Sequence, residues 1–325
     1  MKSRIIQSVR FAFPRSPRRS AANAALGVLA LELALFMAAC AAPLTAPEEA
    51  HEVTDGLGRV IALPTSVDRI VSLAPSNTEM LFAIGAGSQV VGRDEVSDYP
   101  ASASEVQSIG STFGELNTEA ILALDPDLVL AADITAPEQL QSMEAVGLTT
   151  FVVPNPSDFD GLYDNLLLIG EITGHMDEAA DLAQDLRIRM EAVTALTLEE
   201  DPTSVFYEID GSDPNAPWTT GASTFQNLLI ELAGGTNVAS GIEGWGQIDV
   251  EELVVQDPEV IVFATGPFIV TTSESVAERP GWGGIAAVQS GRVVPIDTNW
   301  IDRPGPRLVD GLEALARALH PDLFE

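Results

Sequence analysis

The stretch Asn117-Thr-Glu-Ala-Ile-Leu-Ala-Leu-Asp-Pro-Asp-Leu-Val-Leu-Ala131 occurs a second time, in altered form, as Asp249-Val-Glu-Glu-Leu-Val-Val-Gln-Asp-Pro-Glu-Val-Ile-Val-Phe263. Each copy starts with a helix-capping Asn or Asp, continues as a short amphipathic helix, stops at Asp-Pro and ends in an apolar strand. A second matched pair, residues 147–155 and 291–299, follows in the same order. The repetition predicts one structural unit used twice, and two similar lobes facing each other create a cleft in which a ligand can bind.

Apolar strands alternate with helical segments around both repeats. Residues 69–73 and 204–209 are predicted to be strands that open the two lobes, and Ser76 and Glu79 have the spacing of a capping box that starts the first helix. Because the strands are apolar throughout, the pattern is typical of parallel sheets covered by helices on both faces. We therefore predict an α/β fold whose two similar lobes each hold a central, mostly parallel sheet.

The segment between the lobes has a helical pattern from 156 to 200, interrupted only at Gly174. Apolar residues recur in it at three- and four-residue spacing, as expected of a helix with one buried face: Leu182, Leu186, Met190 and Val193. One long connecting helix would be stiff, so we expect modest movement of the lobes rather than wide hinge closure. The predicted lobes then cover residues 53–155 and 201–325.

The N-terminal segment, residues 1–39, has the features of a signal peptide: a basic region followed by an apolar run from Ala24 to Ala39. The run ends in small residues directly before Cys40, which resembles the lipidation site of bacterial lipoproteins. We expect Cys40 to carry a lipid and residues 40–52 to form a flexible tether, so that the protein lies outside the cytoplasmic membrane. An ordinary cleaved signal or an uncleaved anchor helix is the alternative, and Arg18-Arg19 is a weak indication of twin-arginine export.

The remaining chain is strongly acidic. Of 16 Lys and Arg and 48 Asp and Glu, six basic and one acidic residue precede Cys40, which leaves 10 Arg, 47 acidic residues and a net charge of −37. Nucleic-acid binding needs the opposite sign and is excluded. A high net charge favours a soluble monomer, and the absence of Lys beyond the signal peptide suggests a saline habitat.

The sequence offers no catalytic or metal-binding constellation. A nucleophile elbow, a P-loop and a dinucleotide fingerprint are all absent. The three histidines, His51, His175 and His320, are too scattered for a zinc or manganese site, and a single cysteine excludes disulfides and thiolate-bound metals within the chain. We therefore predict a protein that is not an enzyme and holds no cofactor or metal of its own.

The candidate ligand-binding residues lie in loops at the carboxyl ends of predicted strands, where parallel α/β sheets bind their ligands. They are Pro75, Ser76, Val96, Phe113, Trp218, Trp245, Asn299, Trp300 and Arg303. A loop tryptophan either plugs a local core or offers a flat apolar surface to a ligand. Three tryptophans in this set favour ligand contact, whereas the fourth, Trp282, is predicted to pack locally.

Glu119 and Glu251 occupy the same place in the two repeats, in the first turn of a helix. Acidic residues are favoured there by the helix dipole, by about 0.3–1 kcal/mol, and need no partner. The alternative interpretation is that each lobe presents one exposed carboxylate to an arginine on another protein. The sequence symmetry alone does not decide between the two.

Five stretches together carry a family resemblance: Arg69–Gly85, Asp98–Pro100, Asn117–Ala131, Ala233–Asn237 and Trp300–Arg307. In this order, over residues 53–323, they resemble the helical-backbone (class III) substrate-binding proteins of bacterial ABC importers. These proteins take up cobalamin, ferric siderophores or haem, and the cobalamin receptors are the most similar. The resemblance implies two α/β lobes joined by a long helix, with the ligand held between them.

The resemblance also assigns roles to individual residues. It places Trp218, Trp245, Asn299 and Arg303 at positions that contact the corrinoid in cobalamin receptors. Phe113 stands where Trp is usual and Val96 where a contacting Tyr is usual, so the wall formed by the first lobe has lost one ring. Glu119 and Glu251 align with the two carboxylates that dock on arginines of the membrane permease, which implies an ABC permease and ATPase as partners.

A ferric-siderophore or haem receptor remains an alternative within the family. An axial Tyr or His in the cleft would favour haem, and several cleft arginines would favour an anionic siderophore. The three tyrosines, Tyr99, Tyr163 and Tyr207, have no evident place in the cleft. An enzyme on a related two-lobed fold, such as a metallocluster oxidoreductase, would need cysteine or histidine ligands that this chain lacks.

Overall fold

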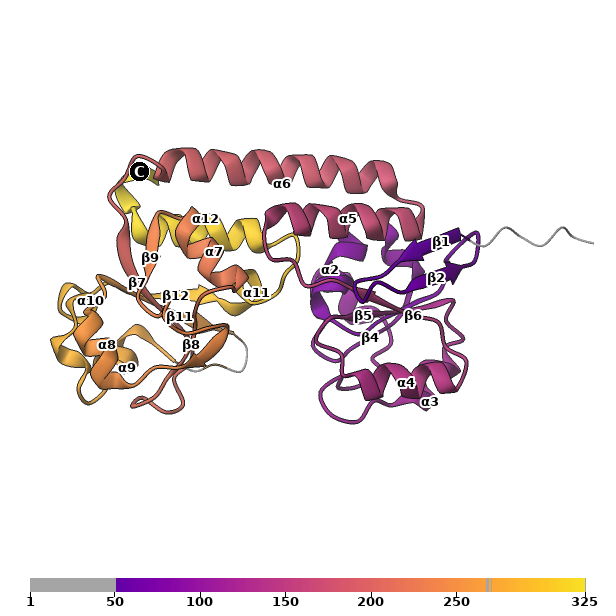
Figure 1. Cartoon of the computed structure of the whole chain (residues 1–325), viewed down its shortest axis with the longest axis horizontal. Coiled ribbons are helices and arrows are strands. Elements are labelled where there is room, and N and C mark those ends of the chain that lie inside the picture. Colours follow the sequence, from indigo (N-terminus) through magenta and orange to yellow (C-terminus); the bar gives the residue numbers. More distant parts are fainter. Residues whose placement is uncertain (1–50, 267–268, 270, 325) are drawn as a thin grey trace, which may run out of the picture. The chain divides into compact units, whose positions relative to one another are not determined.

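The computed structural model describes residues 51–324 except 267, 268 and 270 (Figure 1). The expected signal peptide, Cys40 and most of the expected tether therefore lie outside the described residues. The tether's last two residues, His51 and Glu52, belong to β1 (His51–Thr54), which pairs antiparallel with β2 (Val60–Leu63). No helix within the described ranges is long and apolar enough to cross a membrane.

The first lobe is built on a four-stranded parallel sheet in the order β4-β3-β5-β6. Its strands are β3 (Ile70–Ser72), β4 (Val90–Arg93), β5 (Leu128–Ala132) and β6 (Thr150–Val153). Its helices are α2 (Pro75–Ala83), α3 (Thr118–Ala123) and α4 (Pro137–Ala145), with short 3₁₀ turns at Ala86–Gln89 and Ala101–Glu105. The predicted parallel α/β lobe is confirmed.

The second lobe repeats this order as β9-β7-β11-β12, again parallel. The strands are β7 (Thr203–Asp210), β9 (Gly235–Asn237), β11 (Val260–Thr265) and β12 (Val293–Asp297). Two antiparallel strands, β8 (Trp218–Thr220) and β10 (Trp245–Gln247), extend the sheet beside the end of β7. The helices are α7 (Phe225–Leu232), α8 (Val250–Gln256), α9 (Ser273–Ala277), α10 (Ala286–Ser290), α11 (Thr298–Ile301) and α12 (Leu308–Leu319).

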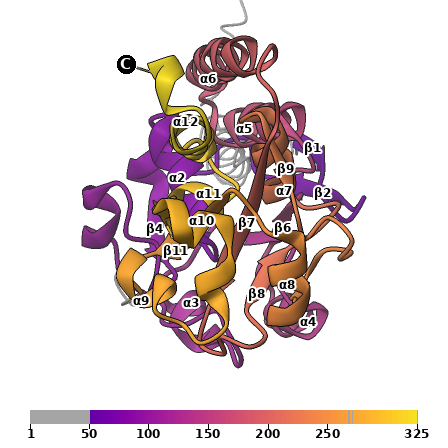
Figure 2. The ribbon, with the colours of Figure 1, turned by 90° about the vertical axis from the view of Figure 1, so that its left-hand side faces the viewer.

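The segment between the lobes forms α5 (Phe159–Thr173) and α6 (Met176–Thr197), separated at Gly174. Gly174 adopts a left-handed conformation, with a φ of 76°, which glycine accepts without steric cost. The long helix α6 packs on α5 at one end and on α7 and α12 of the second lobe at the other, and both views show it across the top of the sheets (Figures 1 and 2). The expected long connecting helix is thus present.

The sheets are apolar on both faces, as the uniformly apolar strands predict. One hydrophobic cluster lies beneath α5, α6 and α12 and includes buried residues of both lobes, among them Ile70, Leu166 and Val262. Each lobe has a second cluster on the opposite face of its sheet, around Val71 in the first lobe and around Phe206 in the second. Because this one cluster contains residues of both lobes and of the connecting helices, it joins the lobes into one packed unit.

Candidate ligand-binding site

A cavity of about 450 Å³ lies between the lobes at the carboxyl ends of the parallel strands. This size falls within the range of small-molecule sites, about 300–1,000 Å³. The first lobe contributes residues that directly follow β3, β5 and β6, and the second contributes Ile209, Phe225, Gln226, Trp245 and residues 302–304. The position is the one that the strand-end rule predicts for a ligand site in parallel α/β sheets.

Six of the nine predicted ligand-binding residues line this cavity: Pro75, Ser76, Val96, Phe113, Trp245 and Arg303. Large apolar side chains remain exposed at its wall, with exposed fractions of 49% for Trp245, 76% for Phe113 and 78% for Ile134. Exposed aromatic and aliphatic groups gathered around a cavity are typical of a binding surface. The cavity therefore offers an apolar wall in each lobe.

Trp218, Asn299 and Trp300 are not among the residues that line the cavity. Trp218 lies on β8, where it pairs with Gln247 of β10, and is 44% exposed. Asn299 and Trp300 lie in the middle of α11, and the backbone carbonyl of Trp300 lies against Gly311 of α12. Because α11 packs on α12 in this way, the cavity is lined by the residues that follow α11, namely residues 302–304.

The capping box predicted for α2 is not formed. Ala74 is the N-cap, no side chain caps the helix, and Pro75 occupies the first turn, where a missing N–H does no harm. Ser76 is thereby free to line the cavity, and the carboxylate of Glu79 is directed to arginines of the other lobe. The spacing of Ser76 and Glu79 predicted a local capping role for Glu79, whereas its partners are distant in the sequence.

A buried polar network that the sequence did not predict lies on the second-lobe side of the cavity. Asp302 accepts hydrogen bonds from Tyr207 Oη (3.0 Å), Gln226 Nε2 (3.0 Å) and Thr298 Oγ1 (2.5 Å). Gln226 Oε1 in turn accepts from Trp245 Nε1 (3.3 Å). Burial raises the pKa of Asp302, against the effect of its three donors. The network connects the Trp245 indole to Asp302 through Gln226. The one feature of the sequence that could have indicated it is that Asp302 directly precedes Arg303, a predicted site residue.

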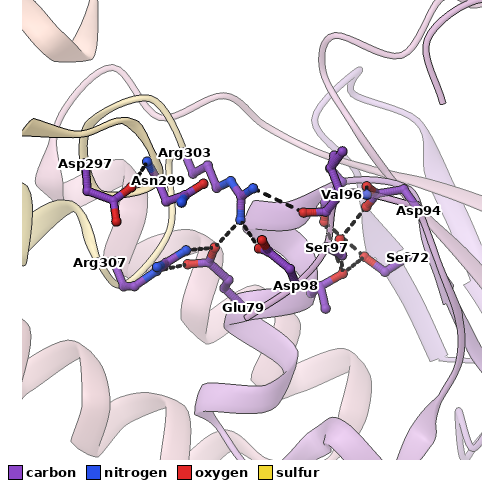
Figure 3. A network of polar contacts seen from close by, with 12 residues as sticks. Ser72, Glu79, Asp94, Val96, Ser97, Asp98, Asp297, Asn299, Arg303 and Arg307 are labelled. Carbon is purple, nitrogen blue, oxygen red and sulfur yellow. Dashed lines mark hydrogen bonds and ion pairs between the residues drawn. The ribbon is translucent and has the colours of Figure 1, made fainter. Parts of the chain in front are cut away.

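The charged groups of the cavity wall are Asp133, Asp302 and Arg303. The Arg303 guanidinium already donates to Glu79 Oε1 (3.2 Å), Asp98 Oδ1 (2.9 Å) and the carbonyl of Val96 (3.1 Å), as Figure 3 shows. A guanidinium shared between two carboxylates has little attraction left for a third. The wall as described is thus apolar with an excess of negative charge.

The tyrosines lie outside the cavity, and no Tyr, His or Cys is among its described lining residues. Tyr207 is buried with its hydroxyl on Asp302, and burial raises its pKa. Tyr99 lies 4.0 Å beneath the Arg307 guanidinium, and Tyr163 is buried near Arg187, with burial raising its pKa to about 12. Over the described ranges, no cluster of three or more His, Cys, Asp or Glu could hold a metal ion.

Glu119 and Glu251 lie in the first turns of α3 and α8 and are exposed. Neither forms an ion pair with another residue in the part of the chain that the structure describes. Both helices lie on the side of their lobe away from α6 (Figures 1 and 2). The two carboxylates are therefore available to a partner that approaches from the side opposite the connecting helix.

Comparison with known proteins gives consistent matches. Residues 70–299 match the periplasmic binding protein family. The chain is 32% identical over 279 residues to the uncharacterized ABC transporter substrate-binding lipoprotein YvrC of Bacillus subtilis, covering 84% of this chain and 86% of the relative. It is 30% identical over 291 residues to a cobalamin-binding protein of Halobacterium salinarum, covering 87% and 75%. A periplasmic heme binding protein from Pseudomonas aeruginosa superposes with a TM-score of 0.71 at 28% identity, covering 78% and 93%.

Proposed function

Since the chain belongs to the class III periplasmic binding proteins of ABC importers, we propose that it captures a corrinoid between its lobes and delivers it to the permease as a lipid-anchored receptor. Family membership makes it a binding protein rather than an enzyme. Two relatives support the finer proposal: one is described as a lipoprotein and the other as a cobalamin-binding protein.

The observation that favours a corrinoid is the chemistry of the cavity wall. Haem carries two carboxylates and takes an axial ligand such as His, Tyr, Cys or Met from its protein. Asp133 and Asp302 would repel the haem carboxylates, Arg303 is already paired, and the described lining has no His, Tyr or Cys. Met80 lines the cavity but is buried, with an exposed fraction of 1%.

A corrinoid avoids both difficulties. The periphery of its ring carries neutral amides, which can donate hydrogen bonds to carboxylates and carbonyls, and its cobalt can bring its own axial ligands. The flat faces of the ring suit Trp245 and Phe113, and covering apolar surface contributes about 25 cal/mol per Å². The same charge argument disfavours siderophores with a net negative charge, because the wall offers no free cation among its described residues.

Delivery is assigned to Glu119 and Glu251. They occupy equivalent positions in the two lobes, are exposed, and lie on the side away from α6. A carboxylate pairs well with an arginine across an interface, through charge-assisted hydrogen bonds. We infer that each lobe contacts one arginine of the permease.

Titration of the purified protein with three coloured ligands tests the proposal: cyanocobalamin, haemin and a ferric hydroxamate siderophore. We expect saturable, stoichiometric binding of cyanocobalamin, followed by its visible spectrum and by quenching of tryptophan fluorescence. Haemin should bind weakly and without the sharp Soret shift of an axially ligated iron. Tight binding of haemin or of the siderophore, with no binding of cyanocobalamin, would overturn the corrinoid assignment and leave the family assignment intact.

A further inference from the structure

One buried carboxylate, that of Glu79, receives two arginines from the opposite lobe (Figure 3). Arg307 donates from Nε to Glu79 Oε2 (2.8 Å) and from Nη2 to Oε1 (2.5 Å), a two-pronged contact. Arg303 Nη1 donates to the same Oε1 at 3.2 Å. Glu79 lies on α2 of the first lobe, whereas the arginines precede α12 of the second, so each of these bonds crosses between the lobes.

The contact is shielded from water. The side chain of Glu79 is 2% exposed, that of Arg307 11% and that of Arg303 17%. The Tyr99 ring covers the Arg307 guanidinium at 4.0 Å, and Gly305 lies against Ser76 of α2. Ion pairs in such surroundings are screened little by solvent, and the loss of one partner leaves a buried charge without compensation.

The loop that faces Arg303 from the first lobe is itself fixed to the sheet and to α2. Asp94 accepts a hydrogen bond from the Ser97 hydroxyl and another from the backbone N–H of Val96 (2.9 Å). The hydroxyls of Ser97 and Thr78 lie 2.9 Å apart, and Thr78 donates to Ser72 Oγ at 2.8 Å. The Val96 carbonyl, a partner of Arg303, is therefore held in place before any ligand arrives, and Asp98, the second partner from this loop, follows directly after Ser97.

We propose that Glu79 is a positioning residue, which holds Arg303 in the cavity wall and fixes the angle between the lobes, so that the binding site is preorganised. Glu79 is not among the cavity-lining residues, so it acts through Arg303 and Arg307 rather than by touching the ligand. The inference rests on the proposed function only for the choice of ligand in the affinity measurement. The geometry itself can be tested without ligand.

The chemistry of the cluster indicates the effect of removing the charge. Glu79→Gln preserves the size of the side chain but removes the carboxylate that Arg303 and Arg307 share. Arg303 then keeps only Asp98, whose side chain is 49% exposed, and Arg307 loses its salt-bridge partner. Mutual repulsion between Arg303 and Arg307 should then loosen the contact between the lobes. If the binding-competent arrangement falls to about a tenth of the population, the apparent affinity weakens about tenfold.

A second buried pair, Glu208 and Arg279, provides a matched control. Its side chains are 2% and 8% exposed, which resembles the burial of Glu79 and Arg307, but both belong to the second lobe. Arg279 also lies over an aromatic ring, that of Trp282, at 4.7 Å. Glu208→Gln should therefore lower the stability of the protein much as Glu79→Gln does, without affecting the contact between the lobes.

The experiment measures the distance between spin labels on the two lobes by pulsed electron paramagnetic resonance, in the absence of ligand. Labels are attached to cysteines introduced at the exposed positions Ser142 and Gln256, with Cys40 replaced by Ser. We expect Glu79→Gln to broaden the distance distribution and to weaken cyanocobalamin binding about tenfold, whereas Glu208→Gln leaves both unchanged. Arg307→Lys keeps the positive charge but cannot make the two-pronged contact with Glu79, so it should have an intermediate effect. It replaces Glu79→Gln in the experiment if that variant does not fold.

Two results would overturn the inference. The first is a Glu79→Gln or Arg307→Lys protein with the wild-type distance distribution. The second is a Glu208→Gln protein that broadens the distribution as much, which would show that any loss of a buried ion pair has this effect. If cyanocobalamin does not bind the wild-type protein, the corrinoid assignment fails, and the distance measurement still decides the role of Glu79.

Discussion

The two lobes share one frame, a four-stranded parallel sheet with its helices, and differ in the strands added to it. The parallel order β4-β3-β5-β6 of the first lobe corresponds to β9-β7-β11-β12 of the second. The second lobe adds the antiparallel strands β8 and β10, and β10 begins with Trp245. In the first lobe, the equivalent connection from β4 to α3 has no such strand and presents Val96 and Phe113 instead. The frame therefore positions the cavity, and the additions determine the character of its walls.

The correspondence extends to the backbone at the end of the repeated helix. Asp125 and Asp257 both adopt the left-handed conformation, each with a φ of 47°, directly before a proline that disfavours the helical alternative. Two residues later, Asp127 Oδ2 accepts the backbone N–H groups of Asp68 (2.9 Å) and Arg69 (2.8 Å) at the start of β3. Glu259 accepts from Ser204 at the start of β7 in the same way (2.9 Å). The acidic residue after each Asp-Pro thus ties two neighbouring strands together.

The largest expected effect concerns the equivalent carboxylates of the two lobes. Reversing both charges, in Glu119→Lys with Glu251→Lys, should abolish cobalamin uptake by cells, because lysines would face the arginines proposed on the permease. The affinity of the purified protein should not change, because neither residue lines the cavity. Each single reversal should reduce uptake to a similar extent if the lobes dock equivalently.

Glu252→Lys is the matched control for this pair. Glu252 lies beside Glu251 on α8 and is exposed, but the first lobe has Ala120 at the corresponding position. Uptake should remain close to that of the wild type. Normal uptake by the double reversal would contradict the docking role.

The second effect distinguishes the two cavity walls. Trp245→Ala should weaken cyanocobalamin binding by at least about 2 kcal/mol, roughly thirtyfold, as is typical when an aromatic anchor that the partner covers on binding is truncated. Phe113→Ala should cost less, a few-fold, because the Phe113 ring is smaller and is 76% exposed. Isothermal titration calorimetry on both variants measures the difference, and Trp245→Phe should recover part of the affinity. Equal losses from the two walls would contradict the asymmetry.

The frame could be predicted from the sequence because its signals are local. A cap, a short helix, Asp-Pro and an apolar run are read within fifteen residues, and both copies form the predicted helix and strand. The side-chain cap is an exception, since Asn117 accepts from Ala120 N–H (3.1 Å) whereas Asp249 makes no such bond. The β8–β10 pair was missed, because each strand has three residues and its existence depends on pairing with a distant segment.

The site was predicted in part for the same reason. The rule that ligands bind at strand ends found Ser76 and Val96, and the family resemblance supported Trp245 and Arg303. Asp302 and Glu79 were missed because their roles depend on partners far away in the sequence: Tyr207 lies 95 residues from Asp302, and Arg307 lies 228 from Glu79. No local pattern reveals such pairs, and the capping-box spacing at Glu79 pointed to a different role.

The third effect compares a buried carboxyl of each lobe, Asp94 and Asp302, whose pKa values burial raises despite the hydrogen bonds that they accept. A carboxyl whose pKa is higher in the folded state contributes stability below that pKa, and this contribution is lost as the pH rises through it. Asp94→Asn and Asp302→Asn should therefore each gain stability relative to the wild type as the pH rises. Asp55, whose pKa is lowered by Arg59 and by backbone donors despite its burial, should behave in the opposite way.

Urea unfolding of these variants from about pH 3 to about pH 8 checks the signs. Asp55→Asn should be less stable than the wild type at high pH, and this difference should shrink as the pH falls. Asp94→Asn and Asp302→Asn should lose stability relative to the wild type as the pH falls, which is the opposite trend. Cyanocobalamin affinity should change more in Asp302→Asn than in Asp94→Asn, because Asp302 lines the cavity whereas Asp94 acts only through the loop that carries Val96. Opposite pH trends would show that burial does not dominate at these two carboxyls.

The smallest effect compares the two left-handed aspartates. Glycine accepts this conformation without strain but costs about 0.5–1 kcal/mol in conformational entropy, so the two effects nearly cancel for Asp125→Gly. Asp257 has an additional role, because its Oδ1 accepts the backbone N–H of Ala286 at 2.7 Å and so fixes the start of α10. Losing that bond should make Asp257→Gly less stable than Asp125→Gly by about 1 kcal/mol. Asp257→Asn, which keeps an acceptor, should restore most of the difference in urea unfolding. Equal stabilities of the two glycine variants would mean that this bond adds nothing to the second copy of the repeat.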